Sequence, residues 1–419
     1  MTTETKPTKL FNWNFLLLWQ GQFVSQLGSQ AYAIAMMFWI KHATDSATLM
    51  GLILMVSSLP GAILGPVGGT IADRYSRRKI IIFSDLINGL CVVGLSSLVF
   101  YYASETNLII TALFIVGLVL GIIGAFFTPA ISAAIPDLVP KESIASANSL
   151  SQSTVQISML IGQGIGGVLY RILGPPALFL IDGITYLFSA ASESFIDIPQ
   201  EIPDKSTGLK EKFREFKEEL KAGFQYVWQY KGMRALFATS AFLNFFAMPF
   251  MVLFPFYVED VLKESVDWFG FLLAGTGFGS LLGYVIAGSI KISGNKRSLF
   301  LIACLVLLSL GWGSIGFVTS PILALFVAGF SGLLGGIFNI NVMTILQVAS
   351  PSEIRGRVFG LLTTLSMGLA PISMGLSGIV ADLLDHNIPM IFLGCGLLMA
   401  LLTLFVSLNR HFRQFLAQE

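Results

Sequence analysis

Cysteine and histidine are scarce in this chain of 419 residues, with three of each. Cys91, Cys304 and Cys395 lie far apart inside hydrophobic runs, so we interpret them as buried apolar side chains and expect no disulfide or metal site. The sequence has no Walker A, H-E-x-x-H, C-x-x-C or G-x-S-x-G motif. We therefore expect no catalytic residues, no metal and no cofactor, and the chain is not expected to be an enzyme.

Charge is also scarce. Only 12% of the residues are Asp, Glu, Lys or Arg, while 54% are hydrophobic and the mean hydropathy is +0.78. Such a composition lies far outside that of soluble globular proteins and indicates a membrane protein. The net charge of +1 comes without any basic stripe interleaved with aromatics, which excludes nucleic acid as an expected partner.

Long hydrophobic runs fill most of the chain. A membrane-spanning helix needs about 20 mostly apolar residues, and we find twelve runs of this kind. They lie near residues 14–40, 48–71, 80–102, 108–134, 147–173, 176–198, 234–258, 267–290, 298–318, 321–349, 358–384 and 388–408. The predicted fold is an all-α membrane protein with 12 transmembrane helices.

The basic residues predict the orientation of these helices. With the N-terminus in the cytoplasm, all of the 25 Lys and Arg except Lys41, Arg171 and Lys263 fall on the cytoplasmic side. The positive-inside rule then places both termini in the cytoplasm of a multi-pass protein of the inner or plasma membrane.

A dense basic cluster lies between the second and third runs. It reads G-x-x-x-D-R-x-x-R-R, from Gly69 through Asp73 and Arg74 to Arg77 and Arg78. The spacing resembles the signature loop between the second and third helices of the major facilitator superfamily. That resemblance implies two bundles of six helices that rock about a central substrate site.

Two features divide the chain in the way this resemblance implies. Residues 199–232 form the longest polar stretch, and their apolar side chains recur every three or four residues, which predicts an amphipathic helix on the cytoplasmic membrane surface. An offset of 211 residues, which places Pro140 on Pro351, superposes two helix-loop-helix units. We therefore predict bundles over 14–198 and 233–408, joined by the linker 199–232.

The first bundle resembles a narrower group, the macrolide-efflux-type exporters. The resemblance rests on Trp19-Gln20-Gly21-Gln22, Phe127-Thr128-Pro129-Ala130 and Ala147-Asn148-Ser149-Leu150-Ser151-Gln152. It implies a secondary exporter of amphipathic small molecules that works by alternating access and proton exchange. A lysolipid flippase and a siderophore exporter of the same fold remain alternatives, because the sequence does not identify the substrate.

Two departures from the exporter pattern weaken the inference of proton coupling. No basic residue lies within 108–136, where many drug:proton antiporters have an arginine in the fourth helix. The fifth-helix glycine motif, Gly162-Gln163-Gly164-Ile165-Gly166-Gly167, lacks its usual proline. The exporter architecture is accordingly better supported than its energy source.

The signature loop predicts a cytoplasmic gate made of Gly69, Asp73, Arg74, Arg77, Arg78 and Asp85. Asp73 could accept hydrogen bonds from the N-terminus of the eleventh helix, near 356–359, where backbone donors and the helix dipole favour an anion. Arginines of the loop could hold Asp73 in place and contact anionic lipid headgroups. The alternative is that these cations only fix the topology.

Asp182 is the most deeply placed acid, about 10 Å into the sixth run. A charge at this depth is costly unless it faces a cavity or a partner. We predict that Asp182 exchanges the coupling proton. The alternative is a structural acid that bonds hydroxyls such as those of Thr185 or Ser189, and Glu193 is interpreted as structural.

The predicted substrate site combines amides with apolar side chains on helices that the superfamily resemblance places around the cavity. Its residues are Gln22, Gln26, Phe127, Asn244, Met248, Asn339 and Asn341. Such a pocket suits an amphipathic molecule. The alternative for each amide is a hydrogen bond between helices. Membrane lipids and protons are the other expected partners, and we expect a monomer.

Overall fold

The structure is a computed structural model that describes residues 9–200, 214, 218, 221, 223–289, 292–351 and 354–417. Every regular element within these residues is a helix, and none is a strand. Ten helical segments among them are long and apolar enough to span a membrane. The prediction of an all-helical membrane protein is thus confirmed, while the count of twelve spanning helices stays a prediction.

The chain forms two compact units. The first contains residues 1–45 and 56–215, and the second contains 46–55 and 216–419. The first unit has the helices α1 (Trp13–Thr44), most of α2 (Ala47–Arg74), α3 (Arg77–Tyr101), α4 (Thr106–Leu138) and α5 (Ile144–Glu193). The second has α7 (Lys231–Phe256), α8 (Asp267–Ser289), α9 (Gly294–Ile315), α10 (Pro321–Ala349), α11 (Arg355–Gly368), α12 (Ala370–Leu383), α13 (Ile388–Ser407) and α14 (Arg410–Leu416).

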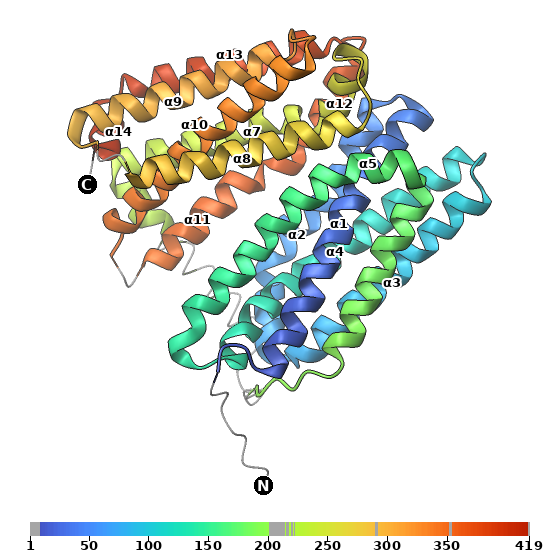
Figure 1. The fold of residues 1–419 in the computed structure, drawn as a ribbon. Helices are drawn as coiled ribbons and strands as arrows, with labels where there is room; N and C mark the ends of the chain where they lie inside the picture. Colours follow the sequence, from blue (N-terminus) through green and yellow to red (C-terminus); the bar gives the residue numbers. More distant parts are fainter. Residues whose placement is uncertain are drawn as a thin grey trace. The chain divides into compact units, whose positions relative to one another are not determined.

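Helix α5 doubles back on itself beside α1 and α3 (Figure 1). Its backbone leaves the helical region at Gly174, where φ is 74°, a conformation that favours glycine, and two prolines follow. The first arm is therefore about 45 Å long and the second about 28 Å. The reversal brings both ends of α5 to the start of α1. There Trp19 donates a hydrogen bond to Thr154, and Gln20 donates one to Ser192.

Local chemistry explains where several helices begin. The Asn12 side chain accepts from the Phe15 amide at the start of α1, and Ser76 accepts from the Lys79 amide at the start of α3. Pro321 begins α10, a position where the missing amide hydrogen costs nothing.

The first turn of α2 is capped by a residue 335 positions away in the sequence. Asp382 of α12 accepts hydrogen bonds from the backbone amides of Ala47 and Thr48, at 2.9 and 3.0 Å, and from the Ser46 hydroxyl at 2.9 Å. His386 lies 2.8 Å from the same carboxylate. These bonds satisfy helix-end donors and fix residues 46–55 within the second unit.

Glycines let the helices of the second unit approach one another closely. A Cβ atom at Gly332 of α10 would collide with the backbone of Thr276 on α8, and one at Gly336 would collide with that of Ser280. Small residues at such crossings allow backbones to touch, which is a main source of packing energy between membrane helices.

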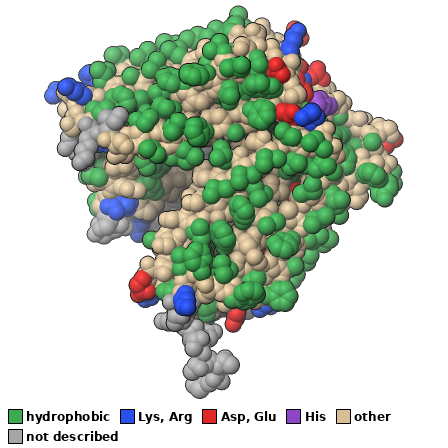
Figure 2. Space-filling view, in the orientation of Figure 1, with side chains coloured by type: hydrophobic (Ala, Val, Ile, Leu, Met, Phe, Trp, Pro, Cys, Tyr) green, Lys and Arg blue, Asp and Glu red, His purple; other side chains and the backbone are tan. Residues whose placement is uncertain are grey.

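The surface fits a lipid environment. On the face in Figure 2, hydrophobic side chains cover the long sides of the helices and charged ones gather near their ends. Large apolar side chains point outward in both units, among them Phe100 at 68% exposure and Phe326 at 75%. The chain is therefore a multi-pass membrane protein.

Most of the predicted linker helix lies outside the described residues. Its last part, residues 223–229, is helical, and the rings of Phe224 and Trp228 stack with centroids 4.9 Å apart. The predicted domain boundaries remain predictions.

Candidate transport site

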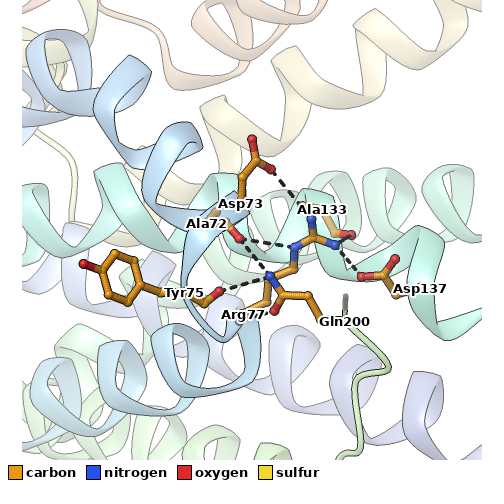
Figure 3. Close-up of polar contacts among 7 residues, drawn as sticks. All are labelled: Ala72, Asp73, Tyr75, Arg77, Ala133, Asp137 and Gln200. Atoms are coloured by element: carbon orange, nitrogen blue, oxygen red, sulfur yellow. Dashed lines mark hydrogen bonds and ion pairs between the residues drawn. The ribbon is translucent and has the colours of Figure 1, made fainter. Parts of the chain in front are cut away.

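The signature loop is held together by one arginine (Figure 3). Arg77 donates from its guanidinium to the carbonyl oxygens of Ala72, at 3.3 Å, and Ala133, at 3.0 Å, and it forms an ion pair with Asp137. A second carboxylate, that of Asp73, lies 3.7 Å from it. Arg77 therefore ties the end of α2 to the end of α4 and lies beside Asp73.

Two members of this cluster were not predicted as site residues. Asp137 lies in the last turn of α4, and Gln200 follows α5. The Gln200 side chain accepts from the Arg77 amide at 2.8 Å and donates to the carbonyl oxygens of Ala72 and Tyr75 (Figure 3). Asp137 could have been found as the acid that lies three residues after the fourth run, because α4 continues beyond the predicted end of that run.

The other predicted gate residues have different surroundings. Gly69 lies one turn before Asp73 on α2, and Arg74 ends that helix with one guanidinium nitrogen buried. Arg78 donates to the carbonyl oxygen of Ser194. Asp85 is fully buried in α3, at 0% exposure.

Three of the predicted substrate residues meet in one cavity of the first unit. Gln22 and Gln26 of α1 and Phe127 of α4 line a space of about 400 Å³. Apolar residues such as Phe15 and Ile131 make up much of the remaining wall. The cavity thus pairs apolar walls with a few amides, the usual composition of a small-molecule site.

The first arm of α5 completes this cavity with polar side chains that were not predicted as site residues: Asn148, Ser151, Gln152 and Thr154. Residues 148, 151 and 152 share one face of a helix because they are spaced by three and four. The available signal was the density of polar side chains over residues 146–158, which is high for a membrane-spanning helix.

Asp182 is buried at 1% exposure in the second arm of α5. One carboxylate oxygen accepts from the Ser29 hydroxyl at 3.4 Å, while the other has no hydrogen-bond partner among the described residues. Ser29 also bonds the Tyr186 hydroxyl at 2.9 Å. Gly28 makes room for this contact, since a Cβ there would lie 2.8 Å from the Asp182 carboxylate.

Glu193 ends the same arm at 1% exposure. It accepts a hydrogen bond of 2.8 Å from the Gln22 amide. Gln22 therefore contacts the buried acid with its amide group and also lines the cavity. Neither oxygen of Asp85 has a hydrogen-bond partner in the described part of the chain.

The predicted substrate residues of the second unit are engaged differently. Asn341 accepts from the Arg297 guanidinium at 3.1 and 3.2 Å and donates to the Ile337 carbonyl. Asn244 donates to the Ser240 carbonyl one turn before it. Asn339 is exposed, and Met248 is half-buried.

The sequence matches a known family over most of its length. The model of the Major Facilitator Superfamily matches residues 18–373. The chain belongs to this superfamily. Its members are transporters and not enzymes, which confirms the predicted family and the expectation that the chain is not an enzyme.

Two curated relatives and one solved structure describe the likeness further. The chain is 28% identical to macrolide efflux protein A of Streptococcus pyogenes, over 90% of this chain and 92% of that protein. It is 26% identical to the enterobactin exporter EntS of Escherichia coli, over 96% and 93%. The nucleoside transporter NupG has a TM-score of 0.71 at 13% identity, over 94% and 99%, which shows a shared fold alone.

Proposed function

We propose that this chain is a secondary active exporter that moves amphipathic small molecules out of the cytoplasm by alternating access, driven by proton entry. The observation that best supports this function is the position of Gln22, which lines the cavity and also donates a hydrogen bond to the buried Glu193. Loss or gain of a proton on Glu193 changes which group the Gln22 amide can bind. Substrate binding and proton binding are therefore linked through one side chain.

The cavity supports the proposed substrate class. Its lining residues carry amides, hydroxyls and apolar groups, and no charged side chain. A pocket of this composition favours a bulky, weakly polar or cationic molecule over an inorganic ion. The relatives named as efflux proteins support export as the direction. Asn244, Met248, Asn339 and Asn341 are the proposed contribution of the second unit.

The proposal places the coupling proton on Asp182. The carboxylate is buried, bonds Ser29 of α1 and has one oxygen without a partner among the described residues. A buried group with a free acceptor can take up a proton without losing an existing bond. Twelve spanning helices, cytoplasmic termini, anionic lipids at the loop cations and a monomeric state belong to the same proposal.

Asp73 has the proposed role of cytoplasmic latch. Arg77 lies 3.7 Å from its carboxylate at the end of α2, and the Asp73 side chain is 47% exposed. An anion at this position suits a helix N-terminus. The proposed partner is the backbone near residue 356, at the start of α11.

Siderophore export is a second candidate function. It is favoured by the 26% identity to the enterobactin exporter, which extends over 96% of this chain. The two candidates differ in cargo and share the fold, the cavity and the direction of transport.

The function can be tested in a bacterium that lacks its own drug pumps. Expression should lower the steady-state accumulation of several hydrophobic dyes and of a macrolide, and a protonophore should cancel the effect. A second strain, deficient in siderophore export, tests the other candidate through restored secretion. Increased uptake of a nutrient, with no change in any of these compounds, would contradict export.

A further inference from the structure

The proposed mechanism uses Glu193 only as the hydrogen-bond partner of Gln22, and it assigns the coupling proton neither to Glu193 nor to the buried Asp85. Asp85 of α3 is 0% exposed and Glu193 of α5 is 1% exposed. Both oxygens of Asp85, one oxygen of Glu193 and the Ser189 hydroxyl have no hydrogen-bond partner among the described residues. A buried polar group without a partner costs stability, so four such atoms together call for an explanation.

The register of the helices places these groups side by side. Helices α3 and α5 cross closely at Gly183, which faces Val93, and one turn away at Gly89, which faces Leu187. The antiparallel register continues by one more turn to Asp85 opposite position 191. This register brings the carboxyl group of Asp85 near Ser189 and Glu193.

Helix α1 closes the third side of this site. A Cβ atom at Gly21 would lie 2.9 Å from the Ser189 hydroxyl, and the Gln22 amide donates to Glu193 at 2.8 Å. The two acids therefore lie at the junction of three helices, surrounded by an amide, a hydroxyl and apolar side chains.

Within the described part of the chain, no lysine or arginine is among the groups that act on either carboxyl group. Asp85 and Glu193 act electrostatically on each other. The charge of Asp85 also acts on Asp182 and Tyr186 of α5. Tyr32 of α1 faces Asp182. Two arginines of the signature loop bind other groups: Arg77 binds Asp137, and Arg78 binds the Ser194 carbonyl.

We propose that Asp85 and Glu193 form a second proton site, in which the two carboxyl groups share a single proton. Two adjacent carboxylates without a cation repel each other in a medium of low dielectric constant. One proton from water, added to one carboxylate oxygen, removes one charge and supplies an O–H donor for the other acid. The Gln22 amide and the Ser189 hydroxyl then stabilise the remaining negative charge.

A polar stripe connects this pair to Asp182. Asp182, Tyr186, Ser189 and Glu193 follow one another at spacings of four, three and four, so they share one face of α5. Ser29 of α1 bridges Asp182 and Tyr186. The stripe spans about 16 Å along the helix and gives a proton a route between the two sites.

The binding of a shared proton stands on the site's own geometry, while its use in transport rests on the proposed function. The test uses the purified full-length chain and infrared spectroscopy of the protonated carboxyl band, with exchange into heavy water to identify it. At neutral pH the wild type should show a band for the pair. Asp85→Asn and Glu193→Gln should each abolish it, because the remaining acid keeps the one negative charge that the site stabilises.

Glu142→Gln is the matched control, since Glu142 is exposed in the turn between α4 and α5, and it should leave the band unchanged. If an acid variant fails to fold, Gln22→Leu removes the amide donor, keeps both acids and should shift the band. A full-amplitude band in both single variants would overturn the shared proton. The shared proton would also be refuted if the wild type showed no band and were thermally stabilised by Na⁺, and if Glu193→Gln lost that stabilisation.

The same samples separate this proposal from the proposed function. A shared-proton band without any export activity would support the shared proton and refute the exporter function. Proton-driven export without such a band would support the exporter function and refute the shared proton.

Discussion

Both units bury hydroxyl side chains, but the described part of the first unit also buries ionisable ones, Lys41 among them. The first buries three carboxyl groups, those of Asp85, Asp182 and Glu193, at the junction of α1, α3 and α5. The buried polar side chains described in the second unit are all hydroxyls: Thr239, Ser298, Ser309, Ser331, Ser350, Ser373, Ser377 and Thr403. Several of these, such as Ser309 and Thr403, donate to a carbonyl one turn earlier in their own helix.

This difference indicates that the two units have different roles. A hydroxyl that bonds its own helix costs little and does not change its charge, whereas a buried carboxyl group responds to pH and to neighbouring charges. We infer that energy coupling resides in the first unit, and that the second unit supplies a rigid frame built on close helix contacts. Variants in each unit test this difference.

The largest expected effect is that of Asp182→Asn. The substitution keeps the size of the side chain and removes the proton site, so accumulation against a gradient should fall to background while substrate binding persists. Transport in vesicles and dye binding by the purified protein measure the two quantities. Gradient-driven export at the wild-type rate would show that Asp182 is structural or unimportant, and a loss of folded protein would point to the structural alternative.

Substitution of a glycine at a close helix crossing of the second unit should lower the stability of the protein. Gly332→Ala pushes a methyl group into the backbone of Thr276 and should cost about 1–3 kcal/mol of stability. Gly394→Ala on α13 is the control, because a Cβ there meets no atom of the described residues within 4 Å. The midpoint of thermal unfolding in detergent measures both. Equal midpoints would show that α8 and α10 adapt to the methyl group.

A smaller effect is expected from Asp382→Asn, which weakens the cap on α2. Loss of a helix cap costs about 0.5–2 kcal/mol, and the backbone amides of Ala47 and Thr48 should exchange hydrogen faster. Asp385→Asn makes the same chemical change at an exposed neighbour and should have no effect. Unchanged exchange at residues 47 and 48 would remove the capping role.

The smallest effect concerns the cavity. Gln26→Leu keeps the volume of the side chain and removes one neutral hydrogen bond, so dye affinity should fall by about 2- to 10-fold. Asn244→Leu makes the equivalent change in the second unit. A larger loss from Asn244→Leu than from Gln26→Leu would shift the substrate site toward the second unit.

The sequence predicted the features that depend on one helix at a time. The all-helical membrane character, the signature loop and the face of α1 that bears Gln22 and Gln26 all follow from spacing along a single segment, while the count of twelve spanning helices stays a prediction. The depth of Asp182 was predicted in the same way, and its burial agrees with that prediction.

The relations between helices could not be predicted from spacing alone. Asp85 and Glu193 each lie near a helix end, and their positions alone suggested a gate residue and a structural acid. Their contact depends on the register between α3 and α5, which the close crossings at Gly89 and Gly183 determine. The cap on α2 by Asp382 likewise joins residues 335 positions apart and leaves no local pattern.

The central claim, that the acids of the first unit couple proton entry to export, is tested most directly in reconstituted vesicles. A pH-sensitive dye should report proton movement when a transported substrate is added in the absence of an imposed gradient. We predict proton flux opposite to substrate flux in the wild type, and none in Asp182→Asn. Substrate movement at the full rate without any proton movement would contradict the account.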